Sequence, residues 1–199
     1  TDIAQRKLRN CALLYIAKHA KQLANELVTK QIGSANNMTD YLAALQAANN
    51  GQLACRDVVM SEFDDKWFEN GLVMDKWFAL QATLSNDSVL ENIKQLFNHR
   101  SFDYSNPNRL RALVGTFVNA NSYHFHAIDG SGYQFLTDQL IKLNSQNPQV
   151  AARLITPLIQ FKRLDVIRIA LIKEQLKRLL DIENLSLDLF EKVSKALTQ

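Results

Sequence analysis

The chain has 199 residues, of which 47% are hydrophobic and 22% charged, a composition typical of one globular domain rather than of a disordered segment. Its 23 basic and 20 acidic residues nearly balance and form no dense basic run, so we expect neither a nucleic-acid partner nor a membrane partner. Six glycines and three prolines are too few for the many tight turns of a β-sandwich or β-barrel.

The two cysteines, Cys11 and Cys55, fall within helical patterns and lack metal-type spacing. We therefore expect two buried thiols in a reducing compartment, which favours a cytoplasmic location. No apolar run reaches the ~20 residues of a membrane span, and no signal peptide is evident. Because Thr1 already lies in a helical pattern, we expect a piece of a longer polypeptide with further chain upstream.

Apolar residues recur at helical spacing along the whole chain, and no segment sustains the alternation of a strand. The first helix is expected to begin near Asp2. Its predicted buried face consists of five residues on one side of the helix: Ala4, Leu8, Cys11, Ala12 and Tyr15. A second helix runs from about Gln22 to Gly33, and Thr39 is expected to cap the third.

The remaining pattern predicts eight further helices, which gives about eleven in all. The apolar residues that mark them are, in order, Phe63, Trp77, Ile93, Leu113, Leu140, Leu154, Ile172 and Val193. Asn106-Pro107 and Asn147-Pro148 each open a helix, with Asn as the N-cap and Pro as the first helical residue. Residues 119–130 are expected to be irregular, Ser131 to cap the next helix, and Pro157 to kink or divide the ninth.

Alternate helices are predicted to begin at regular intervals, near residues 3, 39, 72, 107, 148 and 186. These intervals match the length of two-helix repeats, which stack so that each repeat contacts only its neighbours. We therefore predict an all-α fold in which stacked antiparallel helix pairs form an ARM/HEAT-like α-solenoid or bowl with a concave face.

Few residues offer catalytic chemistry. The sequence contains no HExxH, GxSxG, Walker loop or dinucleotide fingerprint. His124 and His126 form an HxH pair, but a zinc site needs three or four ligands, and two partly exposed loop histidines explain the pattern. The acidic stretch at 62–65 is typical of a solvated helix face, and Trp67 and Trp77 are typical of core packing.

Three arginines are better candidates for binding. Arg109 and Arg111 are two residues apart, so they diverge by about 200° around a helix and cannot share a face. One can lie on the concave side while the other is solvated or paired. Arg153 lies in an apolar segment, where it either extends to solvent or binds a specific acceptor. For each of the three, an ordinary salt bridge is the alternative.

Several long segments carry a family resemblance. They are NNMTD (36–40), CRD (55–57), DDKW (64–67), NGLVMDKWF (70–78), SNPNRLR (105–111), FHAIDGSGY (125–133) and LNSQNPQVAARLITPLI (143–159). In order and nearly end to end, they resemble the C-terminal domain of bacterial aminopeptidase N, a family of zinc-dependent, membrane-free alanyl-type aminopeptidases.

The resemblance implies a four-domain parent enzyme in which residues 1–199 form a single C-terminal helical domain. The catalytic domain would lie upstream with its HExxH zinc site and GxMEN motif, so zinc would belong to the parent. The fragment would carry no metal site and no catalytic residue, and it would be inactive alone. In this family the C-terminal domain closes over the catalytic domain and walls off a chamber that peptides, but not folded proteins, can enter.

By motif, Arg111 and Arg153 correspond to family arginines that line this chamber, and Arg109 corresponds less securely. The resemblance implies that both bind the substrate peptide through its main chain or C-terminal carboxylate, and we expect both guanidinium groups to face the concave side. The implied partners are the upstream catalytic domain of the same chain and peptide substrates. Two alternatives stay open: a free-standing helical-repeat scaffold that binds a peptide or protein in its groove, and an enzyme built on the HxH pair.

Overall fold

A computed structural model describes residues 2–198, which form helices joined by short loops. The helices of the first half are α1 (Asp2–His19), α2 (Lys21–Ser34), α3 (Met38–Gly51), α4 (Arg56–Trp67), α5 (Gly71–Ala82) and α6 (Val89–Leu96). Those of the second half are α7 (Pro107–Leu110), the π-helix η1 (Arg111–Gly115), α8 (Thr116–Ala120), α9 (Ser122–Phe125), α10 (Ser131–Gln146), α11 (Pro148–Leu154), α12 (Thr156–Ile159), α13 (Val166–Leu180) and α14 (Leu187–Leu197). All eleven predicted helices are present, with α7, η1 and α8 forming one of them, so the all-α prediction is confirmed.

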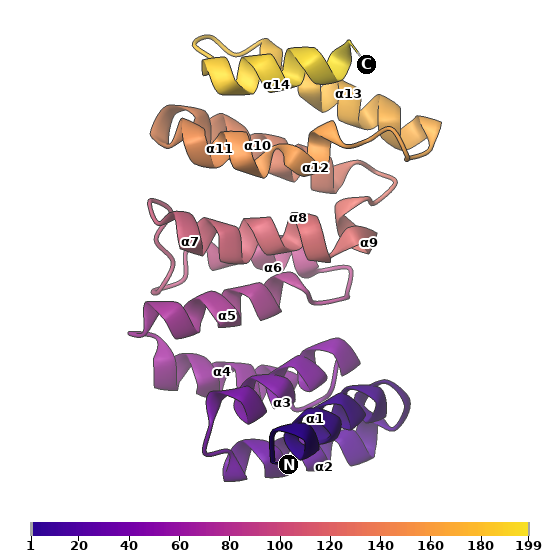
Figure 1. Ribbon diagram of the computed structural model, residues 1–199, viewed down its shortest axis with the longest axis vertical. Coiled ribbons are helices and arrows are strands. Elements are labelled where there is room, and N and C mark those ends of the chain that lie inside the picture. Colours follow the sequence, from indigo (N-terminus) through magenta and orange to yellow (C-terminus); the bar gives the residue numbers. More distant parts are fainter. Residues whose placement is uncertain (1, 199) are drawn as a thin grey trace.

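The helices stack in chain order along the long axis of the molecule, and the two termini lie at opposite ends (Figure 1). Both α1 and α2 pack on α3, α5 packs on η1 and α8, and α14 packs on α11 and α13. The first helices of successive pairs begin at Asp2, Met38, Gly71, Pro107, Pro148 and Leu187, close to the predicted starts. The regular interval in the sequence is therefore the repeat of the stack.

One continuous hydrophobic core runs through the stack, from Leu13 in α1 to Ala196 in α14. Pro157 divides the ninth predicted helix into α11 and α12, as expected for a residue that lacks the backbone donor. Within residues 2–198, no helix combines the length and the apolar composition that crossing a bilayer requires.

Two helix starts differ from the prediction. The cap of α3 is Asn37 rather than Thr39, and its side-chain oxygen accepts the backbone N–H of Asp40 at 3.0 Å. Ser131 is the first residue of α10 rather than its cap. Gly130 precedes it with φ of 73°, a conformation that favours glycine, and the Asp129 carboxylate accepts the N–H of Ser131 at 3.0 Å.

Residues 119–130 are also more regular than predicted. The helix that contains η1 continues to Ala120, and the short α9 follows before the loop that leads to Gly130. A segment of four helical residues is too short to leave a periodic apolar pattern, so the sequence gives no signal for α9.

The predicted buried face of α1 is wrong. All five of its residues are exposed, and Leu8 and Tyr15 have relative accessibilities of 72% and 68%. The helix instead buries Leu13 and Ala17, which lie on nearly the opposite side. The expectation of two buried thiols is wrong for the same reason, because Cys11 is exposed, while Cys55 is half-buried. Spacing identifies an apolar face but does not say what covers it.

Candidate functional site

Arg111 lies on a helix whose start is fixed by its sequence. The side-chain oxygen of Asn106 accepts the N–H of Asn108 at 2.9 Å, and Pro107 occupies the first helical position, as predicted. Arg111 then begins the π-helix η1, where the N–H of Thr116 donates to the carbonyl of Arg111 five residues earlier. Such single π-turns are frequent at functional sites.

Arg153 is positioned by the same device on a neighbouring repeat. The side-chain oxygen of Asn147 accepts the N–H of Val150 at 3.2 Å, and Pro148 follows as the first residue of α11. Arg153 lies one residue before the end of α11, and its side chain is exposed although both sequence neighbours are buried. Of its two expected arrangements, the side chain adopts the one that reaches solvent.

Arg111 and Arg153 line one hollow of about 390 Å³ between the α7–α8 helix and α11, which we call the arginine hollow. Its other walls are Pro107, Gly115, Thr116, Asn119, Ala120, Val150 and Leu154. No carboxylate lines it, and neither guanidinium group has a hydrogen-bond or ion-pair partner among residues 2–198. Two unpaired cations on a largely apolar wall are suited to bind a carboxylate or a row of carbonyl oxygens.

Gly115 lines the hollow at a point where its neighbours approach closely. A Cβ atom at this position would lie 3.3 Å from Cγ of Arg111 and 3.6 Å from Cδ2 of Leu154. The mid-helix glycine therefore allows α11 and the stem of Arg111 to approach the helix backbone closely.

Arg109 has the opposite environment. Its side chain is buried, with 4% of the residue exposed, and its Nη1 lies 2.8 Å from Oδ1 of Asp75. The same nitrogen donates to the carbonyl of Gly71 at 3.2 Å, and the guanidinium carbon lies 5.0 Å from the centre of the Phe78 ring. The predicted divergence of the two arginines is confirmed: Arg109 forms an ion pair with Asp75, and Arg111 has no ion-pair partner among residues 2–198.

The histidine pair has no metal-site geometry. Nδ1 of His126 lies 2.8 Å from the hydroxyl of Tyr133, and burial together with nearby Arg168 lowers the pKa of this imidazole. His124 instead packs edge-on against Tyr123. Among residues 2–198, no group of three or more His, Cys, Asp or Glu side chains could hold a metal ion. The pair therefore lacks the further ligands that a zinc enzyme needs.

The acidic stretch is more than a solvated face. Arg100 lies 2.7 Å from a carboxylate oxygen of Asp64 and equally close to one of Asp65, and so ties α4 to the loop after α6. Trp77 is a core residue as predicted, and its indole N–H donates to the carbonyl of Met60 at 3.0 Å. Neither cluster faces the arginine hollow.

Comparison with known proteins places this fold in a family. Residues 1–198 match the family described as a domain of unknown function (DUF3458_C) with ARM repeats. The chain belongs to this family of ARM-repeat domains. It is 58% identical to aminopeptidase N of Haemophilus influenzae over 196 residues and 57% identical to aminopeptidase N of Escherichia coli over the same length. These alignments cover 98% of the chain but 22% of each relative, so the chain corresponds to about a fifth of their length.

A solved structure has the same fold. The crystal structure of Legionella pneumophila aminopeptidase A in complex with aspartic acid superposes with a TM-score of 0.89 at 29% identity. The match covers 97% of this chain and 23% of that one. The predicted resemblance to the C-terminal domain of aminopeptidase N and the predicted ARM-type repeats are thus confirmed.

Two polar residues that line the hollow were not predicted from the sequence. Thr116 and Asn119 lie on its wall, and the side chain of Asn119 donates to the carbonyl of Gly115 at 2.8 Å. Arg111, Gly115 and Asn119 are spaced four residues apart, so the helical period could have identified them as one face.

Proposed function

We propose that this chain is the C-terminal, chamber-forming domain of a larger, four-domain cytoplasmic aminopeptidase, and that Arg111 and Arg153 bind the substrate peptide. The parent enzyme would remove N-terminal amino acids from peptides by zinc-activated water attack, with the zinc site and the amine-binding motif in upstream domains. The family membership and the aminopeptidase N relatives support this proposal.

The observation that carries the proposal is the pair of unpaired guanidinium groups on one hollow. An arginine without a partner contributes little to the stability of the fold, so its guanidinium group is available for a ligand. A peptide offers carbonyl oxygens and a terminal carboxylate that match the guanidinium fork. The apolar wall between the two cations would accept the side chains of the peptide. The docked catalytic domain would then close the chamber on its other side.

The site is tested in the intact parent enzyme with Arg111→Ala and Arg153→Ala. Loss of a charge-assisted hydrogen bond is expected to raise KM for a tetrapeptide by roughly 10- to 100-fold while kcat changes little. Alanyl-p-nitroanilide has no peptide residue beyond the scissile bond, so it offers the two arginines neither a carbonyl oxygen nor a carboxylate, and its KM should be unchanged. A C-terminally amidated tetrapeptide separates carboxylate binding from main-chain binding.

Arg163→Ala is the matched control, because Arg163 is exposed, has no ion pair among residues 2–198 and lies outside the hollow. Equal KM values for all three variants and the wild type would reject the substrate-binding role.

The fragment itself is expected to be inactive. The purified chain should release no p-nitroaniline from alanyl-p-nitroanilide above the level of a mock purification. Turnover that scales with the chain and with added zinc would contradict this expectation and favour an enzyme built on the HxH pair. A gene that lacks an in-frame HExxH region upstream of Thr1 would instead favour the free-standing peptide-binding scaffold.

A further inference from the structure

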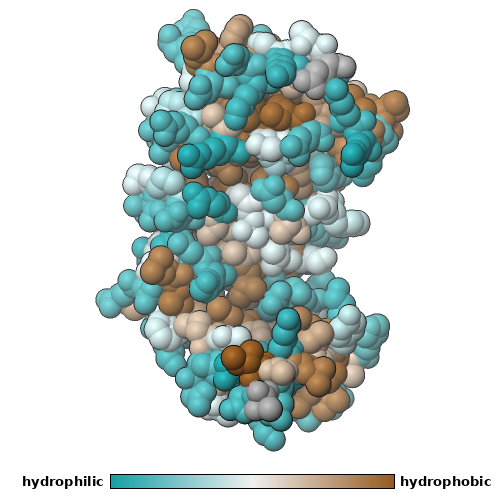
Figure 2. All heavy atoms as spheres, in the orientation of Figure 1, coloured by the Kyte–Doolittle hydropathy of each residue, from teal (hydrophilic) through white to brown (hydrophobic). Residues whose placement is uncertain are grey.

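The arginine hollow offers a ligand many hydrogen-bond donors and few acceptors. The guanidinium groups of Arg111 and Arg153 carry donors only, and neither has an ion-pair partner among residues 2–198. Among the residues that line the hollow, Thr116 and Asn119 are the two with a side-chain oxygen. On the face shown in Figure 2, strongly hydrophilic and apolar side chains lie side by side over α8 and α11. The two oxygens therefore decide what the hollow recognises besides negative charge.

The amide group of Asn119 is held in one orientation by its own helix. Its Nδ2 donates to the carbonyl of Gly115 at 2.8 Å, and only the NH2 end of an amide can donate to a carbonyl. The other end, Oδ1, accepts no hydrogen bond within residues 2–198. Because Asn119 is exposed and already fixed, a ligand that binds Oδ1 costs this side chain little rotamer freedom.

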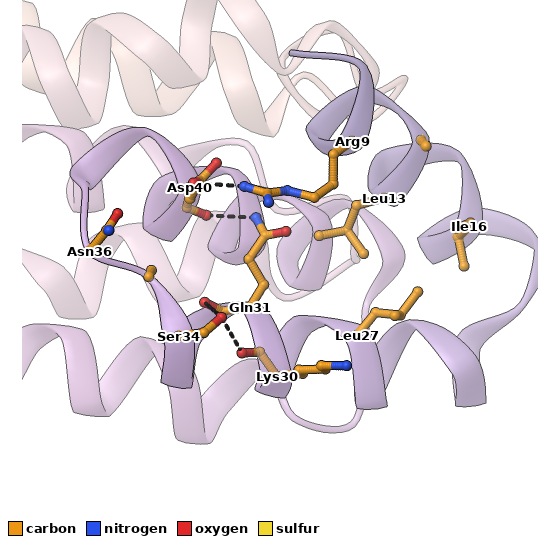
Figure 3. A pocket seen from close by; sticks show the side chains of 11 residues that line it. Arg9, Leu13, Ile16, Leu27, Lys30, Gln31, Ser34, Asn36 and Asp40 are labelled. Carbon is orange, nitrogen blue, oxygen red and sulfur yellow. Dashed lines mark hydrogen bonds and ion pairs between the residues drawn. The ribbon is translucent and has the colours of Figure 1, made fainter. Parts of the chain in front are cut away.

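The groove between α1 and α2 shows the opposite arrangement. It encloses about 520 Å³ and has a polar end. There Arg9 lies 2.7 Å from a carboxylate oxygen of Asp40, and Gln31 donates to the carbonyl of Asp40 at 2.8 Å (Figure 3). The charges of Arg9 and Asp40 thus cancel within the fold. In the arginine hollow two cations and one amide oxygen stay unused, which is the pattern of a binding site rather than of a framework contact.

The spacing of these groups suits an extended peptide. Arg111 and Asn119 lie eight residues apart on one helix face, which corresponds to about 12 Å along the helix axis. An extended chain advances about 3.3 Å per residue, so about three to four residues span this distance. A peptide main chain presents carbonyl oxygens and N–H groups in alternation, so it can supply an acceptor for the arginine and a donor for Asn119. An inorganic anion satisfies the arginine alone.

We propose that Asn119 binds the substrate, and that its Oδ1 accepts a backbone N–H of the peptide. This contact rests on the proposed function, since it requires that the peptide lies in the arginine hollow. It also defines the substrate more closely: an extended peptide with an N–H about three to four residues from the group that Arg111 binds. Peptides that are too short to reach both residues, or that lack this N–H, lose the hydrogen bond.

The experiment removes one backbone N–H of the substrate at a time. In a series of hexapeptides, each peptide bond except the scissile one is replaced in turn by an ester, which has no N–H. KM is measured with the intact parent enzyme from initial rates of release of the first residue. Loss of a neutral hydrogen bond should raise KM about 5-fold at one ester position. With Asn119→Ala, the same ester and the all-amide peptide should have equal KM values, because the acceptor is already missing.

Two control variants should keep the 5-fold ester effect of the wild type. Thr116→Val removes the other side-chain oxygen of the hollow and nearly preserves the shape of the side chain. Asn98→Ala removes an exposed asparagine that does not line the hollow. An ester effect that disappears with Thr116→Val and persists with Asn119→Ala would assign the N–H to Thr116 and overturn the proposal.

A purely structural role of Asn119 predicts a different result. Loss of its bond to Gly115 would then raise KM for every hexapeptide alike, and the ratio of ester to amide KM would stay at the wild-type value, which would overturn the proposal. The arginines are tested separately with the all-amide hexapeptide. Unchanged KM in Arg111→Ala and Arg153→Ala, with an ester effect that depends on Asn119, would reject the arginines and leave this contact standing. Raised KM in both arginine variants, with no ester effect in the wild type, would do the reverse.

Discussion

Arg109 and Arg111, two residues apart on one helix, show two uses of the same side chain. Arg109 extends from α7 toward α5 and is buried there. Its guanidinium group contacts the carboxylate of Asp75, the carbonyl of Gly71 and the ring of Phe78. Arg111 points into the arginine hollow with no partner among residues 2–198. Desolvating a charge is costly unless it is paired, so a buried arginine must be satisfied within the fold, whereas an exposed one can stay available for a ligand. Substitution of Arg109 should therefore lower the stability of the fold, whereas substitution of Arg111 should weaken ligand binding and leave stability nearly unchanged.

The largest effect is expected from Arg109→Ala. The change leaves Asp75 without its partner and removes the contact with Phe78, so the free energy of unfolding should fall by about 3 kcal/mol. Urea unfolding followed by circular dichroism measures it. Arg178→Ala is the control, because its pair with Asp138 is exposed and should contribute less than about 0.5 kcal/mol.

Arg109→Met combined with Asp75→Leu replaces the ion pair by apolar contacts and should recover most of that loss. An Arg109→Ala variant as stable as the Arg178→Ala control would refute the structural role of Arg109.

A smaller effect is expected at Asp40, a second buried charge, whose carboxylate accepts hydrogen bonds from Asn10 and Asn37 and pairs with Arg9. Burial alone would raise the pKa of this carboxyl group, but hydrogen bonds from Asn37, Arg9 and Asn10 outweigh burial and lower the pKa to about 2. A carboxyl pKa below its ordinary value stabilises the fold at pH values above that ordinary value, and the stabilisation disappears as the pH falls through the folded-state pKa.

Asp40→Asn should therefore cost about 2 kcal/mol at pH 6, and the difference from the wild type should nearly vanish at pH 2. Unfolding curves of both proteins across this range measure the difference. A deficit that stays constant with pH would mean that the loss comes from packing rather than from charge.

The smallest effect on stability is expected from Arg111→Ala and Arg153→Ala. Because neither guanidinium group has a partner within residues 2–198, each change should alter the free energy of unfolding by less than about 0.5 kcal/mol. The same urea titrations measure it. A loss as large as that of Arg109→Ala would show that these arginines belong to the framework, and it would remove the contrast with Arg109.

The sequence predicted most of the stack and only part of the site. Apolar spacing and the two Asn-Pro caps located the helices, because caps and amphipathic periods are local properties of a few residues. Each cap also fixed how far Arg111 and Arg153 lie from the start of their helices. Local rules could not show that both side chains reach one hollow, since this depends on the packing of α11 against the α7–α8 helix.

Two further errors have physical causes. The helix that begins at Pro107 was expected to be regular, because nothing in the segment Arg111–Gly115 distinguishes a π-turn from an α-turn in sequence. At α1 the apolar face was identified correctly from its spacing, but the prediction that this face is buried was wrong. Leu8 and Tyr15 form a real apolar face, but no part of residues 2–198 covers it, whereas Leu13 and Ala17 are buried by contacts within those residues.

The unlike ends of the stack also limit how copies of the chain can assemble. The exposed side of α14 carries Asp188, Glu191 and Lys195 beside Leu187 and Phe190, whereas the exposed side of α1 carries the apolar stripe of Ala4, Leu8, Cys11, Ala12 and Tyr15. Head-to-tail growth would pair these unlike surfaces, so an open filament is disfavoured. Two uncovered α1 faces can meet only around a twofold axis, which closes the assembly at two subunits. Such a pair would bring two basic surfaces together, because residues 2–34 carry six basic side chains and two acidic ones, so high salt should strengthen it by screening their repulsion.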